Sequence, residues 1–166
     1  VLVNNAGGLV RRAKLADLDD ALFDAVVDLN IRQLVMASRA ALPWLVRSRG
    51  NIINTSSIAA RNGGGIGASL YASAKAFVST LTRNWAKELG PQGVRVNAVS
   101  PGVIETPFHQ RFSTPEMLES MRRTIPMERL GAAADCTGTF LYLASDEMSG
   151  YVTGQVVEVN GGQLMP

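Results

Sequence analysis

The chain has 166 residues, of which 46% are hydrophobic and 18% charged, and its formal net charge is +2. That length suits one domain, and the hydrophobic content excludes the polar profile of a disordered chain. The small basic excess forms no cluster, which argues against a nucleic-acid partner. The single Cys136 excludes an intramolecular disulfide and a Cys-rich metal site, so we expect no metal. The sequence shows neither a membrane-spanning apolar run nor a secretory leader, which favours the cytoplasm.

The first half of the chain alternates strand and helix patterns. Val1–Val3 reads as a buried strand that ends in a tight loop over residues 4–8. Aspartates near residue 19 then predict the start of a helix, whose apolar face carries four residues at helical spacing: Leu22, Phe23, Val26 and Val27. A second helix is predicted over about 31–48. A second strand is predicted over 51–55.

The second half continues the alternation. A Gly-rich loop over 62–67 precedes a long helix predicted for 69–89, which Gly90-Pro91 ends. Strands follow at 94–99 and 153–159, with a helix at about 132–144 between them. Residues 103–126 show no clear period apart from a short helix near 115–123. Strands alternating with helices predict an α/β fold, a doubly wound parallel sheet covered on both faces.

Tyr71 and Lys75 are the first candidate catalytic residues. Their spacing of four places both side chains on one face of the long helix, one turn apart. A free phenol titrates near pH 10 and is a poor base at neutral pH, but a nearby ammonium favours the phenolate. Lys75 can therefore make Tyr71 a working acid and base. The alternative is a chance pairing on an amphipathic helix.

Two further polar positions accompany this pair. Ser56 and Ser57 end a predicted strand, which is where open α/β sheets place their ligands. A hydroxyl there can bind a substrate oxygen, although two serines can also simply cap a strand. Asn30 falls between two helical patterns and is either a cap or kink residue, or an anchor for a water-linked relay to Lys75. The lone His109 is expected to be a surface residue outside the catalytic set.

These motifs stand together and in order: the Asn-Asn-Ala-Gly of residues 4–7, Asn30, the serine pair, Tyr71-x-x-x-Lys75 and Pro101-Gly102. The sequence resembles a classical short-chain dehydrogenase/reductase over essentially all of its length. The resemblance implies a catalytic tetrad of Asn30, Ser57, Tyr71 and Lys75. Tyr71 would exchange a proton with the substrate oxygen, Ser57 would orient that oxygen, and Lys75 would lower the pKa of Tyr71.

The same resemblance implies NAD or NADP as the cofactor. Lys75 would bind the nicotinamide ribose beside Tyr71, and the remaining cofactor contacts would come from the turn after the first strand and from the segment after the third: Asn5, Ala6, Gly7, Pro101, Gly102, Val103, Ile104 and Thr106. The segment from about 103 to 126 would form a flap over the substrate. A carrier-protein partner would favour basic residues near the site entrance. Candidates are Arg111, Arg122, Arg123 and Arg129, although solvated surface arginines explain them more simply.

The family's glycine turn for the cofactor pyrophosphate and the strand that selects NAD or NADP have no counterpart here. The resemblance therefore implies an N-terminally truncated chain, in which residues 1–166 form a partial Rossmann-type domain with the family's strands four to seven. Its first strand would then lie at an open edge of the sheet, with unpaired backbone groups and uncovered apolar faces.

The expected function is hydride transfer between a nicotinamide cofactor and a secondary alcohol or ketone, with small molecules as substrates. The motif pattern is similar to 3-oxoacyl-carrier reductases and to sugar or polyol dehydrogenases. The alternative is a truncated, non-catalytic chain that serves only in oligomerisation or partner binding. A homodimer or homotetramer is expected through the helices at about 31–48 and 71–89.

Overall fold

The computed structural model describes residues 1–165 and contains a four-stranded, fully parallel sheet. Its strands are β1 (Leu2–Asn4), β2 (Asn51–Thr55), β3 (Arg95–Pro101) and β6 (Val156–Val159), and they pair in that order. This confirms the α/β fold with a parallel sheet, in the strand order expected from the resemblance. A separate two-stranded ladder joins β4 (Ile104–Glu105) and β5 (Gly131–Ala132).

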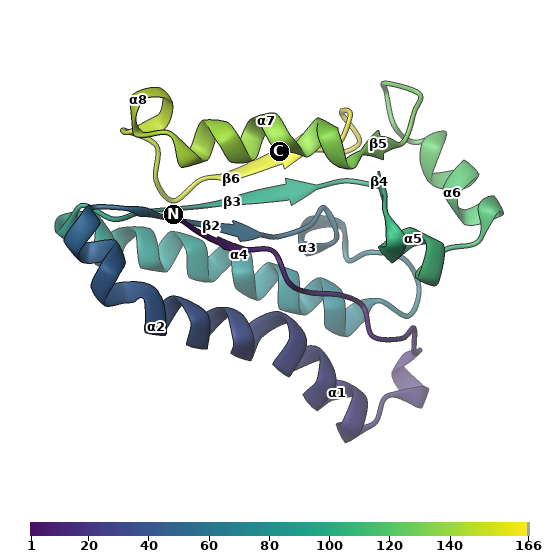
Figure 1. Ribbon diagram of the computed structural model, residues 1–166. Helices are drawn as coiled ribbons and strands as arrows, with labels where there is room; N and C mark the ends of the chain where they lie inside the picture. The colour runs from purple at the N-terminus through teal and green to yellow at the C-terminus, as the bar shows by residue number, and fades with distance from the viewer. Residues whose placement is uncertain (166) are drawn as a thin grey trace.

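Helices cover both faces of the sheet (Figure 1). On one face lie α2 (Gln33–Ser48) and α4 (Ser69–Leu89), which contact β1 to β3. On the other face lies α7 (Ala133–Ala144), which contacts β2, β3 and β6. The helix α1 (Asp20–Val27) precedes α2 and packs against α4. The layered arrangement follows from parallel strands, because each crossover must return over a face of the sheet.

Alternating side chains of β2 and β3 build the two cores. Ile52 and Val96 point to the α2 and α4 side, where they pack with Leu45 and Leu89. Their neighbours on the opposite face, which include Ile53, pack beneath α7. All of these side chains are at most 5% exposed. This two-residue alternation is the geometric property of a strand that turns one apolar run into two cores.

A row of buried polar side chains lies on the face of the sheet that α2 and α4 cover. Asn4 of β1 donates to Asn54 of β2 at 2.9 Å and to Ser38 of α2 at 2.9 Å. Asn54 in turn donates to Thr82 of α4 at 2.9 Å. Asn54 and Thr82 are fully buried. Because buried polar groups are costly unless paired, this chain of hydrogen bonds fixes the register of β1 against β2 and both helices.

Replacing Asn54 with alanine tests that row. The change removes two buried side-chain hydrogen bonds and leaves a small cavity, so we expect the free energy of unfolding to fall by about 2–4 kcal/mol. Urea unfolding followed by circular dichroism measures the loss. The exposed Gln92→Ala serves as a control and should change stability by less than about 0.5 kcal/mol. Equal midpoints for the two variants would contradict the structural role of the row.

Several short elements differ from the sequence predictions. Asp28–Arg32 forms a π-helical turn, η2, that joins α1 to α2 without a break. The segment expected to lack a period contains α5 (Pro107–Phe112) as well as the expected α6 (Pro115–Arg122). A short α3 (Ala59–Asn62) precedes the Gly-rich loop, and α8 (Asp146–Ser149) follows α7. Single-turn 3₁₀ helices occupy Leu15–Asp17 and Gly90–Gln92.

The last strand is shorter than predicted. The pattern indicated a strand over 153–159, but β6 begins only at Val156. Gly154 has φ +73°, and the Thr153 hydroxyl accepts a hydrogen bond from the backbone N–H of Val96 at 3.0 Å. A left-handed glycine and a side chain used as a strand partner interrupt a regular ladder, so β6 forms only beyond them.

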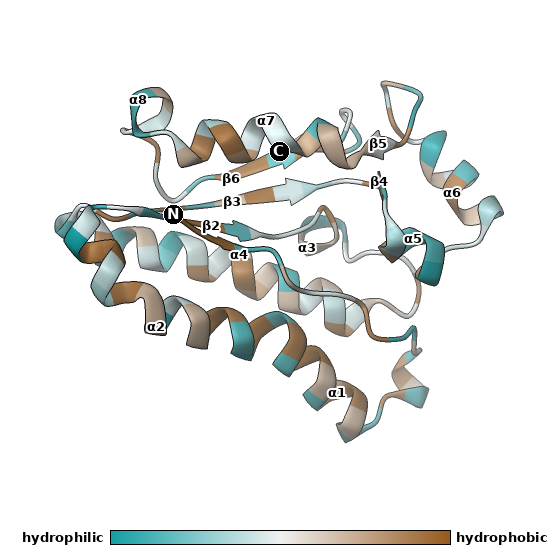
Figure 2. Ribbon diagram, in the orientation of Figure 1, coloured by the Kyte–Doolittle hydropathy of each residue, from teal (hydrophilic) through white to brown (hydrophobic). Residues whose placement is uncertain are grey.

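The first strand lies at one edge of the four-stranded sheet. Within the part of the chain that the structure describes, β1 pairs with β2 on one side only. Val3 is 48% exposed, and Figure 2 shows hydrophobic residues along β1 next to the open edge. This is the open apolar edge that the sequence predicted. Among the described helices, none is both long and apolar enough to span a membrane.

Candidate active site

The carboxyl ends of β1, β2 and β3 meet at one edge of the sheet and border a cleft of about 770 Å³. Parallel strands direct the turns that follow them to the same edge, which is where open α/β sheets bind ligands. Gly7 follows β1, Ser56 and Ser57 follow β2, and Gly102 follows β3, and all four line the cleft. The helix α4 adds Tyr71 and Lys75.

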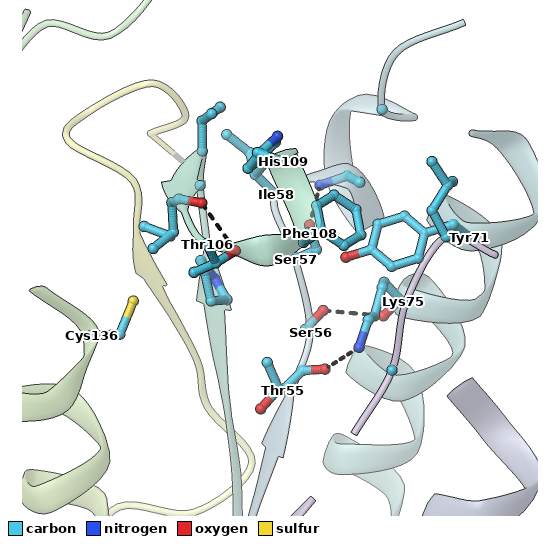
Figure 3. Close-up of a pocket in the computed structure, with 18 of the residues that line it drawn as sticks. Thr55, Ser56, Ser57, Ile58, Tyr71, Lys75, Thr106, Phe108, His109 and Cys136 are labelled. Atoms are coloured by element: carbon cyan, nitrogen blue, oxygen red, sulfur yellow. Dashed lines mark hydrogen bonds between the residues drawn. The ribbon is translucent and has the colours of Figure 1, made fainter. Parts of the chain in front are cut away.

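The two adjacent serines have different surroundings. Ser56 is 2% exposed, and its hydroxyl lies 2.7 Å from the Ser79 hydroxyl and 3.1 Å from the Lys75 carbonyl. It therefore ties β2 to α4. The Ser57 side chain is partly exposed, accepts from the Ala59 N–H at 3.2 Å and interacts with the Tyr71 phenol. Ser57 is thus the hydroxyl placed beside Tyr71 (Figure 3).

Lys75 is a buried cation held at the floor of the cleft. Its side chain is 4% exposed, and Nζ donates to the Thr55 carbonyl at 2.8 Å, as Figure 3 shows. No carboxylate lies within salt-bridge distance of it among residues 1–165. Burial without a counter-charge lowers the pKa of Lys75 to about 8. Two of its three N–H groups have no partner within the described residues.

The pKa of Tyr71 differs from the expectation that Lys75 lowers it. Burial raises the pKa of the phenol above its usual value near 10, and the Ser57 side chain only partly offsets this effect. The Lys75 Nζ lies 5.8 Å from the centre of the Tyr71 ring and is bonded to a carbonyl instead. In this structure the neutral phenol is therefore the dominant form at neutral pH.

Asn30 occupies the π-helical turn η2 and is 1% exposed. Its amide donates to the Gly8 and Val26 carbonyls at 2.9 Å each, and its Oδ1 accepts the Gly8 N–H at 3.0 Å. Asn30 is therefore a clamp on the glycine turn after β1 and does not line the cleft. π-helical turns often occur at functional sites, and the sequence pattern did not predict such a turn here.

Gly7 lies between Asn30 and Lys75. A Cβ at Gly7 would come within 2.9 Å of the Asn30 Oδ1 and 3.0 Å of the Lys75 Nζ, so any side chain would obstruct the cleft floor. The missing side chain leaves backbone open beside two free ammonium N–H groups. Such a cradle fits the ribose of a nicotinamide cofactor, which offers hydroxyl acceptors and needs close backbone approach.

Most of the other predicted cofactor contacts also line this cleft: Asn5, Pro101, Gly102, Val103, Ile104 and Thr106. Ala6 does not line it, and its carbonyl accepts from Gln33 at 3.1 Å. The Val103 carbonyl accepts from the Gly131 N–H at 3.0 Å, which orders the segment after β3. The structure therefore brings the predicted cofactor contacts together around one cleft, except for Ala6, which is exposed outside its lining.

The flap segment contributes aromatic residues that the sequence did not single out for catalysis. Phe108 of α5 lies with its ring centre 5.6 Å from that of Tyr71 and packs edge-on against His109. His109 is partly exposed and lines the cleft, a position that the sequence did not predict for it. Burial and the charge of Arg12 lower its pKa. A non-periodic loop pattern gives no signal for this placement, which depends on the long-range approach of α5 to α4.

Two remaining sequence interpretations concern single residues. Cys136 is a buried residue of α7 that borders the cleft. Three of the four arginines predicted near the site entrance are engaged in ion pairs: Arg122 and Arg123 with Glu119, and Arg129 with Asp135. Residues 1–165 contain no group of three or more His, Cys, Asp or Glu side chains arranged to hold a metal ion.

Comparison with known proteins gives consistent relatives. Residues 1–163 match a family model described as enoyl-(acyl carrier protein) reductase. The chain is 40% identical to a 3-oxoacyl-[acyl-carrier-protein] reductase of Thermotoga maritima over 99% of its length and 66% of that relative. It is 39% identical to a (3R)-3-hydroxyacyl-CoA dehydrogenase of Canis lupus familiaris, of which it covers 63%.

Solved structures agree with these sequence relatives. An NADH-dependent reductase of alginate metabolism, complexed with NAD, superposes with TM-score 0.86 at 40% identity, over 99% of this chain and 64% of that one. A 3-oxoacyl-[acyl-carrier protein] reductase from Brucella melitensis gives 0.92 at 37% identity, over 99% and 62%. The chain thus spans about two thirds of the length of these relatives. It belongs to the short-chain dehydrogenase/reductase family.

Proposed function

We propose that this chain carries the substrate-activating residues of an NAD(P)-dependent oxidoreductase that interconverts a secondary alcohol and a ketone. The observation that carries the proposal is the convergence of Ser57, Tyr71 and Lys75 at the floor of one cleft. The family membership and the NAD-complexed relative support it. Residues 1–165 are proposed as the catalytic portion of a Rossmann-type domain, with 103–126 as the substrate flap.

The residues would divide the work as follows. Lys75 and the turn at Gly7 would hold the ribose of the nicotinamide cofactor, and the segment from Pro101 to Thr106 would hold its carboxamide. The cofactor, when bound, supplies or accepts the hydride. Ser57 would orient the substrate oxygen by a hydrogen bond, and Tyr71 would exchange a proton with it. Asn30 would keep the glycine turn in place and anchor a water-linked relay to Lys75.

The raised pKa of Tyr71 gives this proposal a pH test. A neutral phenol can donate its proton to a ketone oxygen, whereas alcohol oxidation needs the phenolate. We therefore expect the kcat of ketone reduction to stay level from pH 6 to 7, below the pKa of about 8 of Lys75, while the kcat of alcohol oxidation rises over the same range. Absorbance of the reduced nicotinamide at 340 nm measures both directions, with NADH and with NADPH. Failure to turn over any secondary alcohol or ketone with either cofactor would contradict the proposed function.

Assembly and location are part of the same proposal. Large apolar side chains are exposed on α2 and α4, with Met36 49%, Trp44 66% and Phe77 41% exposed. Such a surface fits a homodimer or homotetramer formed through these two helices. A cytoplasmic location suits the proposed cofactor. A non-catalytic role as a partner-binding module remains the second candidate, which the open edge and exposed Val3 of β1 favour.

A further inference from the structure

The charged side chains that line the cleft, among the described residues, are all basic. Three basic side chains border it, Arg12, Lys75 and His109, and no Asp or Glu is among the described lining residues. Lys75 lies at the floor beside the glycine turn and is assigned above to the cofactor. His109 has a lowered pKa, so its imidazole is neutral at physiological pH. Besides Lys75, Arg12 is therefore the side chain that carries a positive charge in the described lining of the cleft.

Arg12 is held in place by main-chain carbonyls. Its Nε donates to the Phe112 carbonyl of α5 at 3.0 Å, and its Nη1 donates to the Ile66 carbonyl of the Gly-rich loop at 3.0 Å. No carboxylate of the described residues lies within 4.0 Å of it, unlike the adjacent Arg11, which pairs with Asp19 at 2.7 Å. A guanidinium has five N–H groups, so three remain available. The residue is a pre-positioned cation without a counter-charge.

The contacts of Arg12 place it at the flap end of the cleft. The Phe112 ring packs against Phe108 at 5.1 Å between centres, and Phe108 packs against Tyr71 at 5.6 Å. Arg12 binds the carbonyl at the end of this aromatic row and also borders the Gly-rich loop. Arg12 therefore borders the cleft where α5 and the Gly-rich loop meet, and Phe108 lines the same cleft beside Tyr71. An occupant that reaches both groups needs a carbonyl, a short apolar link and an anion.

We propose that Arg12 binds the carboxylate of an oxo-acid or hydroxy-acid substrate and so determines the substrate class of this enzyme. The inference rests on the proposed function, because it concerns the same cleft. The planar fork of arginine matches a carboxylate through two parallel hydrogen bonds, and two main-chain anchors already hold it. The Phe108 ring lines the cleft beside Tyr71. The substrate carbonyl would lie several bonds from its carboxylate.

Matched pairs of ketones test this assignment. We expect the protein to reduce 4-oxopentanoate and 5-oxohexanoate with a lower KM than their methyl esters, which lack the charge and carry one additional methyl group. Arg12→Gln should raise the KM for the acids about ten- to hundred-fold, as expected for a lost charge-assisted hydrogen bond, and leave kcat and the KM for the esters nearly unchanged. Arg12→Lys should give an intermediate KM. Arg11→Gln is the matched control and should change neither substrate.

The outcomes separate this inference from the proposed function. If the esters are reduced and the acids are not preferred, the oxidoreductase stands and the role of Arg12 is overturned. If Arg12→Gln raises the KM for acid and ester alike, Arg12 only holds the flap, and the inference also fails. If no ketone is reduced, calorimetric titration with 5-oxohexanoate tests the carboxylate site at Arg12 directly. Binding that Arg12→Gln abolishes supports the carboxylate site, and equal or absent binding refutes it.

Discussion

Tyr71→Phe should lower kcat for ketone reduction by a factor of about 10³ or more while the affinity for the nicotinamide cofactor changes little. The substitution removes one hydroxyl and keeps the ring, so the contact with Phe108 at 5.6 Å is preserved. Without the phenol, the Ser57 side chain loses the hydroxyl with which it interacts. Steady-state kinetics with a saturating ketone measure the loss, and calorimetry measures cofactor binding.

The control for this experiment is Tyr142→Phe, which changes an exposed tyrosine of α7 that does not border the cleft. It should retain the activity of the unmodified protein. If Tyr71→Phe also retained activity, the acid and base assignment would be wrong. If it lost cofactor binding along with turnover, Tyr71 would have to be regarded as a structural part of the cofactor site.

Lys75→Met should have opposite effects on activity and stability. Activity should fall at least about a hundred-fold, because the ammonium is proposed to hold the cofactor ribose beside Tyr71. Stability at pH 7 should rise by up to about 3 kcal/mol, because a buried lysine whose pKa is lowered from 10.5 to about 8 disfavours the folded state when charged. Methionine fills a similar volume without that charge.

The pH dependence gives this prediction a clear sign. Between pH 8 and 10 the unfolded chain keeps a proton on Lys75 that the folded chain has lost, so the stability of the unmodified protein rises with pH. The stabilising difference of Lys75→Met should therefore be largest below pH 8 and should shrink toward pH 10. Urea titrations at pH 7, 8, 9 and 10 measure it. A constant difference over this range would contradict a charged, buried Lys75.

The sequence predicts element boundaries correctly where local residue patterns determine them. The boundaries of the strand at 51–55 and the helix at 69–89 were predicted as the structure has them, because Gly and Pro residues mark their ends and the apolar period is regular. The pairing of Tyr71 with Lys75 follows from helical geometry alone. Choosing Ser57 over Ser56 needed the family resemblance, since both follow the same strand.

The remaining features depend on contacts that no local pattern encodes. Phe108 and Arg12 reach the cleft because α5 and the segment after β1 approach α4 from distant parts of the chain. The π-helical turn at Asn30 preserves apolar periodicity on both sides of it, so the pattern shows two helices and hides their junction. The pKa of Tyr71 is set by burial, which spacing along a helix cannot report.

The turn η2 also determines how two helical faces are aligned. A π-helical turn contains one more residue than an α-helical turn, and each residue of a helix corresponds to about 100° of rotation. The extra residue therefore sets the rotational phase between α1, which buries Val26, and α2, which buries Leu34 and Ser38. A one-residue deletion within 28–32 would turn α2 relative to the sheet and direct Ser38 away from Asn4. The length of this junction is thus a property of the fold, independent of which residues occupy it.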